Sequence, residues 1–221
     1  MAGARTDGRV ERGNQTRRLV LGRTMAIASV EGLDGLSLGR IAGELGLSKS
    51  GVFALFGSKE ELQLATIRAA VAVFADQIVR PAREVPEGLG QVWQLCQRYL
   101  DYSRARVFPG GCFFTAVSAE FSARGGPVRD AVARAREDWV ELVEGMIERA
   151  GPRGELRPDA EIGQLAFELM ALLEMANAQS VLHDDDSGYR RAEVAIRRLL
   201  REAAADPAGL EFPGLSDRVG G

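Results

Sequence analysis

The chain has 221 residues, of which 46% are apolar and 27% are charged, and its formal net charge is −3. This composition excludes a disordered chain and predicts a folded protein with one ordinary domain or two small ones. The sequence contains no run of about 18 apolar residues, which argues against a membrane span, and its polar N-terminus lacks the apolar core of a signal peptide. We therefore expect a cytoplasmic protein with no membrane partner.

Cysteine and histidine are too scarce to suggest a catalytic or metal centre. Cys96 and Cys112 show no Cys-x-x-Cys spacing, and His183 is the single histidine. A disulfide framework, a histidine-based metal site and a Ser-His or Cys-His pair are therefore disfavoured. Cys112 begins a helix after Pro-Gly-Gly, where it is either a redox-sensitive thiol or, more simply, a small core residue. We expect no cofactor, no metal and no enzymatic activity.

Charge is distributed unevenly along the chain. Residues 1–59 carry a net charge of +4, whereas residues 60–221 carry −7. A basic front on an acidic body is typical of a chain whose N-terminal end meets DNA or a membrane surface, although so modest an excess also arises by chance.

The apolar spacing is helical almost throughout, which predicts an all-α fold. Residues 1–13 are polar and rich in Arg and Gly, and we expect them to form a disordered basic arm. Ser37, Ser48 and Ser58 are predicted N-caps, because each precedes a short run with helical spacing. The helices that follow the arm are predicted over residues 16–30, 37–45, 48–56 and 58–80.

Longer amphipathic patterns predict a C-terminal helical domain over residues 63–205. The segment 159–182 is apolar on nearly all sides, so it needs cover on most faces, and a second subunit is the expected cover. Residues 206–221 have no periodicity and are predicted to be a flexible tail. The helices of this domain are predicted near residues 89–100, 112–123, 128–146, 159–182 and 187–205.

Residues 38–56 show a helix, a glycine turn at Gly46 and a second short helix, which is the pattern of a helix-turn-helix. Short helix pairs of this kind also occur in bundles that bind nothing. The second helix is expected to enter the DNA major groove, which is about 12 Å wide, because its outward face is small and polar. The inward residues are Val52, Leu55 and Phe56, and the outward residues are Lys49, Ser50, Phe53 and Ala54.

Residues 16–62 resemble the DNA-binding domain of the TetR family of bacterial transcriptional regulators. The resemblance rests on EGLDGLSL, on IAGELGLSKSGVFALF and, most specifically, on FGSKEEL at residues 56–62, which is similar to the family's Phe-x-Ser/Asn-Lys-Glu-x-Leu. It implies a three-helix DNA-binding domain over residues 14–62, followed by a C-terminal ligand-binding and dimerisation domain. It also implies a homodimer whose partners are a double-stranded DNA operator and a small-molecule effector.

The resemblance further implies which residues contact DNA. Ser37 and Lys59 match positions that contact phosphate, and Lys49 lies where the family reads bases. Phe53 replaces a common tyrosine and Leu55 a frequent histidine, so two polar contacts of the family are missing here. Two arginines at the start of the first helix either contact phosphate or are solvated. The candidate DNA-binding residues are Arg17, Arg18, Ser37, Ser48, Lys49, Ser50, Gly51, Phe53 and Lys59.

The candidate effector residues are aromatic, sulfur-containing and polar side chains on the predicted inner faces of the C-terminal helices. Bulky apolar walls with a few polar groups are typical of ligand cavities, although each apolar member is equally at home in an ordinary core. Glu174 and Asn177 interrupt an apolar helix, so each needs a partner: a ligand, a helix end or a second subunit. The set is Phe74, Trp93, Cys96, Tyr99, Phe113, Phe114, Trp139, Met146, Phe167, Met170, Glu174 and Asn177.

These observations favour a ligand-responsive repressor that binds a palindromic operator as a dimer, with recognition helices about 34 Å apart. A small apolar or amphipathic effector is expected to release it from DNA. The alternatives are an all-helical small-molecule-binding protein or enzyme without a DNA-binding role, and a helical adaptor that binds only proteins.

Overall fold

The computed structural model describes residues 3–212, and this part of the chain is helical apart from turns and an isolated bridge between Leu156 and Ala204. The predicted all-α class is confirmed. The chain divides into two compact units that do not follow one another simply along the sequence. Residues up to Ala72 and Phe108–Ala133 form the first unit, and the rest of the chain forms the second.

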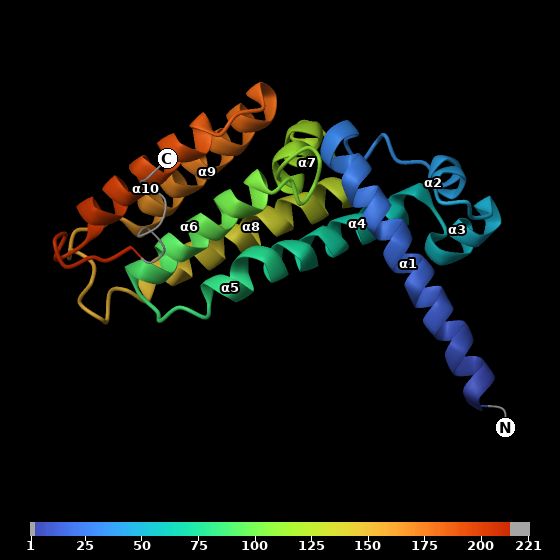
Figure 1. Ribbon diagram of the computed structural model, residues 1–221, viewed down its shortest axis with the longest axis horizontal. Helices are drawn as coiled ribbons and strands as arrows, with labels where there is room; N and C mark the ends of the chain where they lie inside the picture. Colours follow the sequence, from blue (N-terminus) through green and yellow to red (C-terminus); the bar gives the residue numbers. More distant parts are fainter. Residues whose placement is uncertain (1–2, 213–221) are drawn as a thin grey trace. The chain divides into compact units, whose positions relative to one another are not determined.

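The first unit contains the helix-turn-helix and a helix that comes from much later in the chain (Figure 1). Both α4 and α8 begin in this unit and continue into the second one. Its helices are α1 (Gly3–Glu31), α2 (Leu38–Glu44), α3 (Lys49–Phe56), α4 (Lys59–Phe74), α7 (Phe113–Phe121) and the start of α8 (Pro127–Glu148).

The second unit contains the remainder of α8, the segment from Val73 to Val107 and the two helices that follow α8. In Figure 1, α9 and α10 lie side by side along their length, in agreement with their extensive contacts. Its other elements are the π-helical turn η1 (Ala75–Val79), α5 (Arg80–Ala82), α6 (Leu89–Arg104), α9 (Ile162–His183) and α10 (Ser187–Ala203).

Serine caps define the starts of α2, α3 and α4, as the sequence predicts. The hydroxyl oxygens of Ser37, Ser48 and Ser58 each accept a hydrogen bond from the backbone N–H three residues later, at 3.0–3.1 Å. Each bond satisfies one of the N–H groups that have no partner inside a helix. Gly46 and Gly57 have φ of 65° and 75°, a conformation that glycine adopts without strain, and so end α2 and α3.

The first helix begins earlier than the sequence analysis expects. It starts at Gly3 rather than near Thr16, so residues 3–13, predicted to be a disordered arm, are helical in the structure. The lack of apolar residues in this segment predicts disorder. The segment nevertheless contains no proline and several good helix formers. Extending an existing helix adds one hydrogen bond for each residue that is fixed, so it needs no buried face of its own. Residues 1–2 lie outside the described range.

The fourth helix also departs from a simple prediction. Residues 58–80 were expected to form one helix, whereas α4 ends at Phe74 and gives way to the π-helical turn η1. A π turn inserts an extra residue, so the side chains after Phe74 rotate relative to those before it. Ile78 and Val79 of this turn are buried, as is Phe74 before it.

Part of the predicted flexible tail is packed in the structure. Phe212 is buried, and its ring centroid lies 4.9 Å from the ring centroid of Trp93. The Arg201 guanidinium lies 5.0 Å from the centroid of the Phe212 ring. One aromatic residue in an aperiodic segment is enough to anchor it when a groove is available. The rest of the predicted tail, residues 213–221, lies outside the described range.

Two apolar stretches have the length and hydropathy of membrane spans. The continuous stretch Lys59–Ala82 and the helix α9 have mean hydropathies of 1.4 and 1.2. About half of each stretch is buried inside the fold (50% and 44% of its most apolar window), as in a core helix of a folded domain. By themselves, length and hydropathy are therefore weak support for a membrane-spanning role.

A tight turn before α7 lies directly against α1 in the first unit. The backbone N–H of Gly110 donates to the Ser29 hydroxyl at 3.1 Å. A Cβ added at Gly110 would lie 1.8 Å from the Ser29 carbonyl oxygen, so only glycine fits this approach. On either side of the turn, the rings of Phe108 and Phe113 contact each other, with centroids 5.9 Å apart.

Gly110→Ala should therefore lower the free energy of unfolding by about 1–3 kcal/mol, because backbone atoms must separate to admit the methyl group. Urea unfolding followed by circular dichroism measures this change. Gly125→Ala is the matched control, because Gly125 has open space around it and its stability should stay within about 1 kcal/mol of the parent. Equal effects of the two substitutions would contradict the close approach at Gly110.

Candidate DNA interface and effector core

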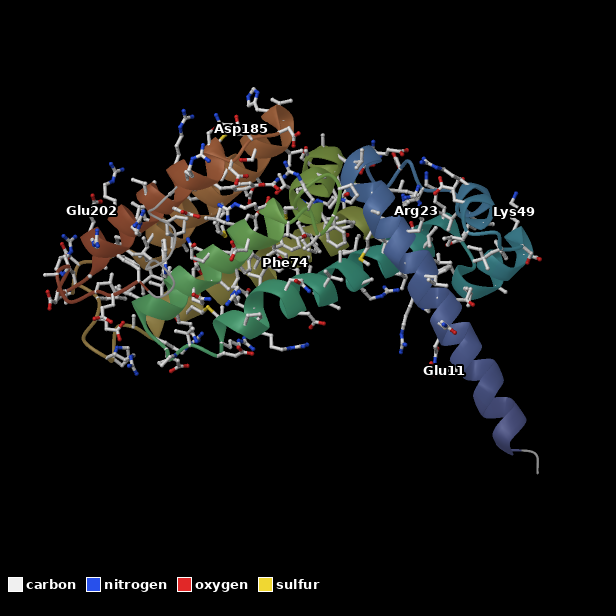
Figure 2. All side chains as sticks on the ribbon, in the orientation of Figure 1. Glu11, Arg23, Lys49, Phe74, Asp185 and Glu202 are labelled. Atoms are coloured by element: carbon white, nitrogen blue, oxygen red, sulfur yellow. The ribbon has the colours of Figure 1, made fainter. Side chains whose placement is uncertain are left out.

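The α3 helix presents an apolar face to the first unit, and its solvent face carries both polar and apolar side chains. Val52 and Phe56 are buried, whereas Lys49 and Ser50 are exposed. Phe53 is 54% exposed, which is unusual for a large aromatic side chain in a short helix. Figure 2 labels Lys49 at the start of α3, on the outer edge of the α2–α3 pair. The face predicted to contact bases is therefore on the surface of the protein.

Arg17 is used inside the first unit to fix the end of α3. Its guanidinium donates to the Leu55 carbonyl oxygen at 2.8 Å and lies 4.5 Å from the centroid of the Phe56 ring. That carbonyl belongs to the last turn of α3, where carbonyl groups have no intrahelical partner. Arg17 therefore positions α3, a role that the sequence interpretation did not include. The neighbouring Arg18 is exposed.

Two other arginines near the helix-turn-helix are compensated by acidic side chains. Arg40 donates to Glu31 at 2.7 Å and to Glu44 at 2.8 Å, and Arg23 pairs with Glu44. These hydrogen bonds lower the pKa of both glutamates below the usual range and raise the pKa of Arg40. Arg23 and Arg40 are therefore paired with carboxylates of the same chain at the protein surface.

Lys59, the predicted phosphate-binding lysine, is the first residue of α4 and contacts the loop between α1 and α2. Its ammonium donates to the Asp34 carbonyl oxygen at 2.7 Å and lies 3.8 Å from the Asp34 carboxylate. Asp34 in turn forms an ion pair with Arg124. Neither Asp34 nor Arg124 was singled out from the sequence, because 90 residues separate them.

Three of the predicted effector residues form an aromatic cluster in the second unit. The Phe74 ring meets the rings of Trp139, Tyr102 and Tyr99 edge to face, with centroids 4.8, 5.8 and 6.1 Å apart. Tyr99 stacks on Trp139 at 6.4 Å. Figure 2 shows Phe74 at the end of α4, directed toward the neighbouring helices. Tyr102 belongs to this cluster although the sequence interpretation omitted it.

The other predicted effector residues are distributed between the two units. Trp93 packs on Phe212, whereas Phe113 and Phe114 belong to the first unit, where their rings lie 5.3 Å apart. Met146 and Met170 are buried, as is Cys96, and burial raises the pKa of the Cys96 thiol to about 12. A thiol with this pKa stays protonated and unreactive at neutral pH.

The two polar effector candidates on α9, Glu174 and Asn177, find partners within the chain. Asn177 is buried, and its side-chain oxygen accepts from the Ser103 hydroxyl at 2.6 Å. Ser103 also contacts the Tyr189 hydroxyl at 2.8 Å, to which Arg106 donates at 3.0 Å. Glu174, outside this network, forms an ion pair with Arg136 of α8. Glu174 and Asn177 each needed a polar partner, for which the sequence suggested a ligand, a helix end or a second subunit. Side chains on neighbouring helices provide these partners.

Phe167 lies on the surface of α9 rather than on its inner face. It is 64% exposed, and Met175 and Leu182 on the same helix are 65% and 79% exposed. A helix that is apolar on nearly every side has no pattern that distinguishes its inner face from its outer face. Among the side chains that the structure describes, no three His, Cys, Asp or Glu residues are grouped to hold a metal ion.

Arg17→Met should lower the free energy of unfolding by about 1–2 kcal/mol, because it keeps the aliphatic stem but removes the charged hydrogen bond and the contact with the Phe56 ring. Urea unfolding with both circular dichroism and tryptophan fluorescence measures the loss. Arg18→Met is the control and should change stability by less than about 0.5 kcal/mol. An equal loss for both would show that Arg17 is an ordinary surface arginine.

Residues 20–66 match the family model of bacterial regulatory proteins of the tetR family, and residues 88–196 match that of the tetracyclin repressor-like C-terminal domain. A search of curated proteins finds no match.

Solved structures with the same fold include several regulators of low sequence identity. A TetR transcriptional regulator from Chloroflexus aurantiacus is 21% identical, with a TM-score of 0.81 over 88% of this chain and 98% of the other. SCO4454, a TetR-family regulator from Streptomyces coelicolor, is 22% identical, with a TM-score of 0.75 over 92% and 96%. AibR, solved in complex with isovaleryl coenzyme A and operator DNA, is 15% identical, with a TM-score of 0.67 over 83% and 97%. With both of its parts matched by TetR family models, the chain belongs to the TetR family of transcriptional regulators.

Proposed function

We propose that this protein is a ligand-responsive repressor that binds a palindromic DNA operator as a homodimer in the cytoplasm. The observation that carries the proposal is the surface of α3, a short helix in a TetR-family helix-turn-helix whose exposed residues include Lys49, Ser50 and Phe53. A helix with small and polar outward side chains can approach base edges in the major groove.

Bases and phosphates are contacted by different residues in this proposal. Lys49 and Ser50 have the donors and acceptors to read base edges, and Phe53 offers an apolar surface to a thymine methyl group. Lys59 binds phosphate at the N-terminus of α4, where the helix dipole also favours an anion. The capping hydroxyls of Ser37 and Ser48 accept backbone N–H groups, so their own protons remain available for phosphate oxygens.

The surface of α9 and α10 supports a dimer. On α10, Val194 is also exposed, at 62%, and lies in a groove that Arg190, Arg191 and Arg198 help to line. Large apolar side chains gathered on one face of a folded protein usually mark an interface. A two-fold axis through this face would bring the same surface of a second copy against it.

The aromatic cluster supports an apolar or amphipathic effector. Phe74 ends the same helix that Lys59 begins, about 22 Å away along the axis. An effector that parts the rings around Phe74 would tilt α4 and change the spacing of the paired recognition helices. It acts only through its different affinities for the two states. AibR, which shares the fold, binds both an acyl-coenzyme A and operator DNA.

The rival function is an all-helical small-molecule-binding protein or enzyme that does not bind DNA. A titration of the purified protein with a fluorescein-labelled duplex carrying the DNA upstream of its own coding sequence separates the two. Tight binding that falls steeply with salt supports the repressor. If this duplex and duplexes selected from a random library all fail to bind an intact dimer, the repressor is the wrong function.

Lys59→Ala and Lys49→Ala should weaken DNA binding in different ways. Loss of the phosphate contact at Lys59 should reduce affinity for all duplexes alike and lower the salt slope by about 1 for each subunit. Loss of Lys49 should change the preferred bases at one position. Fluorescence anisotropy over a panel of duplexes at several salt concentrations measures both, with Arg134→Ala, an exposed substitution on α8, as control. The reverse pattern would exchange the two roles.

A Phe167→Glu, Leu182→Glu double variant should dissociate the dimer, because it places charges in the apolar face that the second copy covers. Sedimentation velocity measures the loss of dimer, and circular dichroism checks that the helices persist. Val71→Glu, on an exposed apolar residue of α4, is the control and should remain dimeric. Two variants that both stay dimeric would place the interface elsewhere.

A further inference from the structure

The loop between α1 and α2, residues 32–37, is held in place by the end of α7. Both oxygens of the Glu120 carboxylate accept backbone N–H groups of this loop, from Leu33 at 2.7 Å and from Asp34 at 2.8 Å. Gly32 has a φ of 79°, and a Cβ at this residue would lie 2.5 Å from the Glu120 carboxylate. The loop conformation is therefore fitted to one carboxylate from α7.

The other side of the loop is bound by α4. Gln63 donates to the Leu33 carbonyl oxygen at 2.9 Å, and Lys59 donates to the Asp34 carbonyl oxygen at 2.7 Å. The loop thus has its N–H groups bound by α7 and its carbonyl groups bound by the first turns of α4. A displacement of the loop relative to α4 would change what Lys59 contacts.

The Asp34 carboxylate is a potential competitor for the Lys59 ammonium. It lies 3.8 Å from that ammonium, close enough for a charged interaction, but its hydrogen-bonded partner is Arg124. The hydrogen bond with Arg124 holds the pKa of Asp34 below its usual range, so the carboxylate is charged at neutral pH. The Arg124 guanidinium also lies over the Phe121 ring, 5.1 Å from its centroid.

The Lys59 ammonium and the Asp34 carboxylate both affect how tightly a phosphate is bound. An ammonium group has three N–H donors, and in Lys59 one of them is committed to the Asp34 carbonyl oxygen. If the Asp34 carboxylate took a second donor, its negative charge would also repel a phosphate at the same place. Arg124 removes both effects, because it binds the carboxylate and neutralises its charge.

We propose that Arg124 is a positioning residue for DNA binding, which keeps the Asp34 carboxylate engaged and thereby leaves Lys59 available to a backbone phosphate. The inference rests on the proposed DNA-binding function and adds a control point to it. Arg124 and Glu120 lie at the junction of α7 and α8, and α8 is the helix that also carries Trp139 of the aromatic cluster. A shift of this junction would release Asp34 toward Lys59 and weaken DNA binding.

The test compares Arg124→Gln, Asp34→Asn and the double variant in the full chain. Each is titrated by fluorescence anisotropy against the duplex that the parent protein binds, at several salt concentrations. Arg124→Gln should weaken binding about fivefold to tenfold, as expected for the loss of one charged contact, and should lower the salt slope. Asp34→Asn alone should bind as tightly as the parent or tighter, and the double variant should return to within about twofold of the parent.

Two further variants make the outcome specific. In a Lys59→Met background, Arg124→Gln should have no additional effect on affinity, because the lysine that it serves is gone. Arg129→Gln is the matched control, since Arg129 is a similarly exposed arginine a few residues along, paired with its neighbour Asp130. It should bind DNA like the parent. Thermal unfolding of every variant checks that the first unit remains folded.

A purely structural ion pair gives a different result. If Arg124 and Asp34 only brace the loop, Asp34→Asn weakens binding as much as Arg124→Gln does, and the double variant is no better than either. If Arg124 itself contacts phosphate, Asp34→Asn fails to rescue Arg124→Gln, and the effect persists without Lys59. Either outcome overturns the inference, whereas failure of the parent to bind any duplex overturns the repressor function instead.

Discussion

Two backbone N–H groups decide how the first unit is built. The chain leaves α1 through a glycine with positive φ, so the N–H groups of Leu33 and Asp34 point away from any helix and need acceptors. The Leu33 N–H is partly buried, and such a group without an acceptor costs about 1–3 kcal/mol, whereas the Asp34 N–H is exposed. The carboxylate of Glu120 satisfies both N–H groups at once. A segment from the middle of the chain is thereby required for the correct entry into the helix-turn-helix.

The second unit uses a hydrogen-bond network in a similar way. A chain of hydrogen bonds runs from Arg106 through Tyr189 and Ser103 to Asn177 and joins the end of α6 to α9 and α10. Apolar packing alone tolerates small shifts of one helix along another, whereas a network of this kind is satisfied in one register only. Arg106 has a φ of 48°, an uncommon conformation that its bonds to Tyr189 and to the Ser180 carbonyl oxygen stabilise. Of the helices that carry the aromatic cluster around Phe74, α6 is thus held in register by this network.

Local features of the sequence predicted most of the secondary structure. The starts of α2, α3 and α4 follow from serine residues whose hydroxyl groups reach only their own helix, so neighbouring residues alone determine them. The first helix was placed too late because a polar segment can extend a helix without burying anything. The π-helical turn after Phe74 was missed because it depends on which side chains are buried on either side of it. The packing of Phe212 on Trp93 was missed for the same reason, since no local pattern marks its partner.

The sequence by itself determined most of the helices, the serine caps and the helix-turn-helix, because each depends on residues within one or two turns of each other. Its short motifs also indicated the family. Only the tertiary structure decided which arginines are engaged, which face of α9 is exposed, and which residues hold the loop beside Lys59. Asp34 and Arg124 are 90 residues apart, and nothing in either segment marks the other as its partner. Charge complementarity acts through space over a few ångströms, so a partner of this kind is fixed only when the helices that carry the two residues have packed.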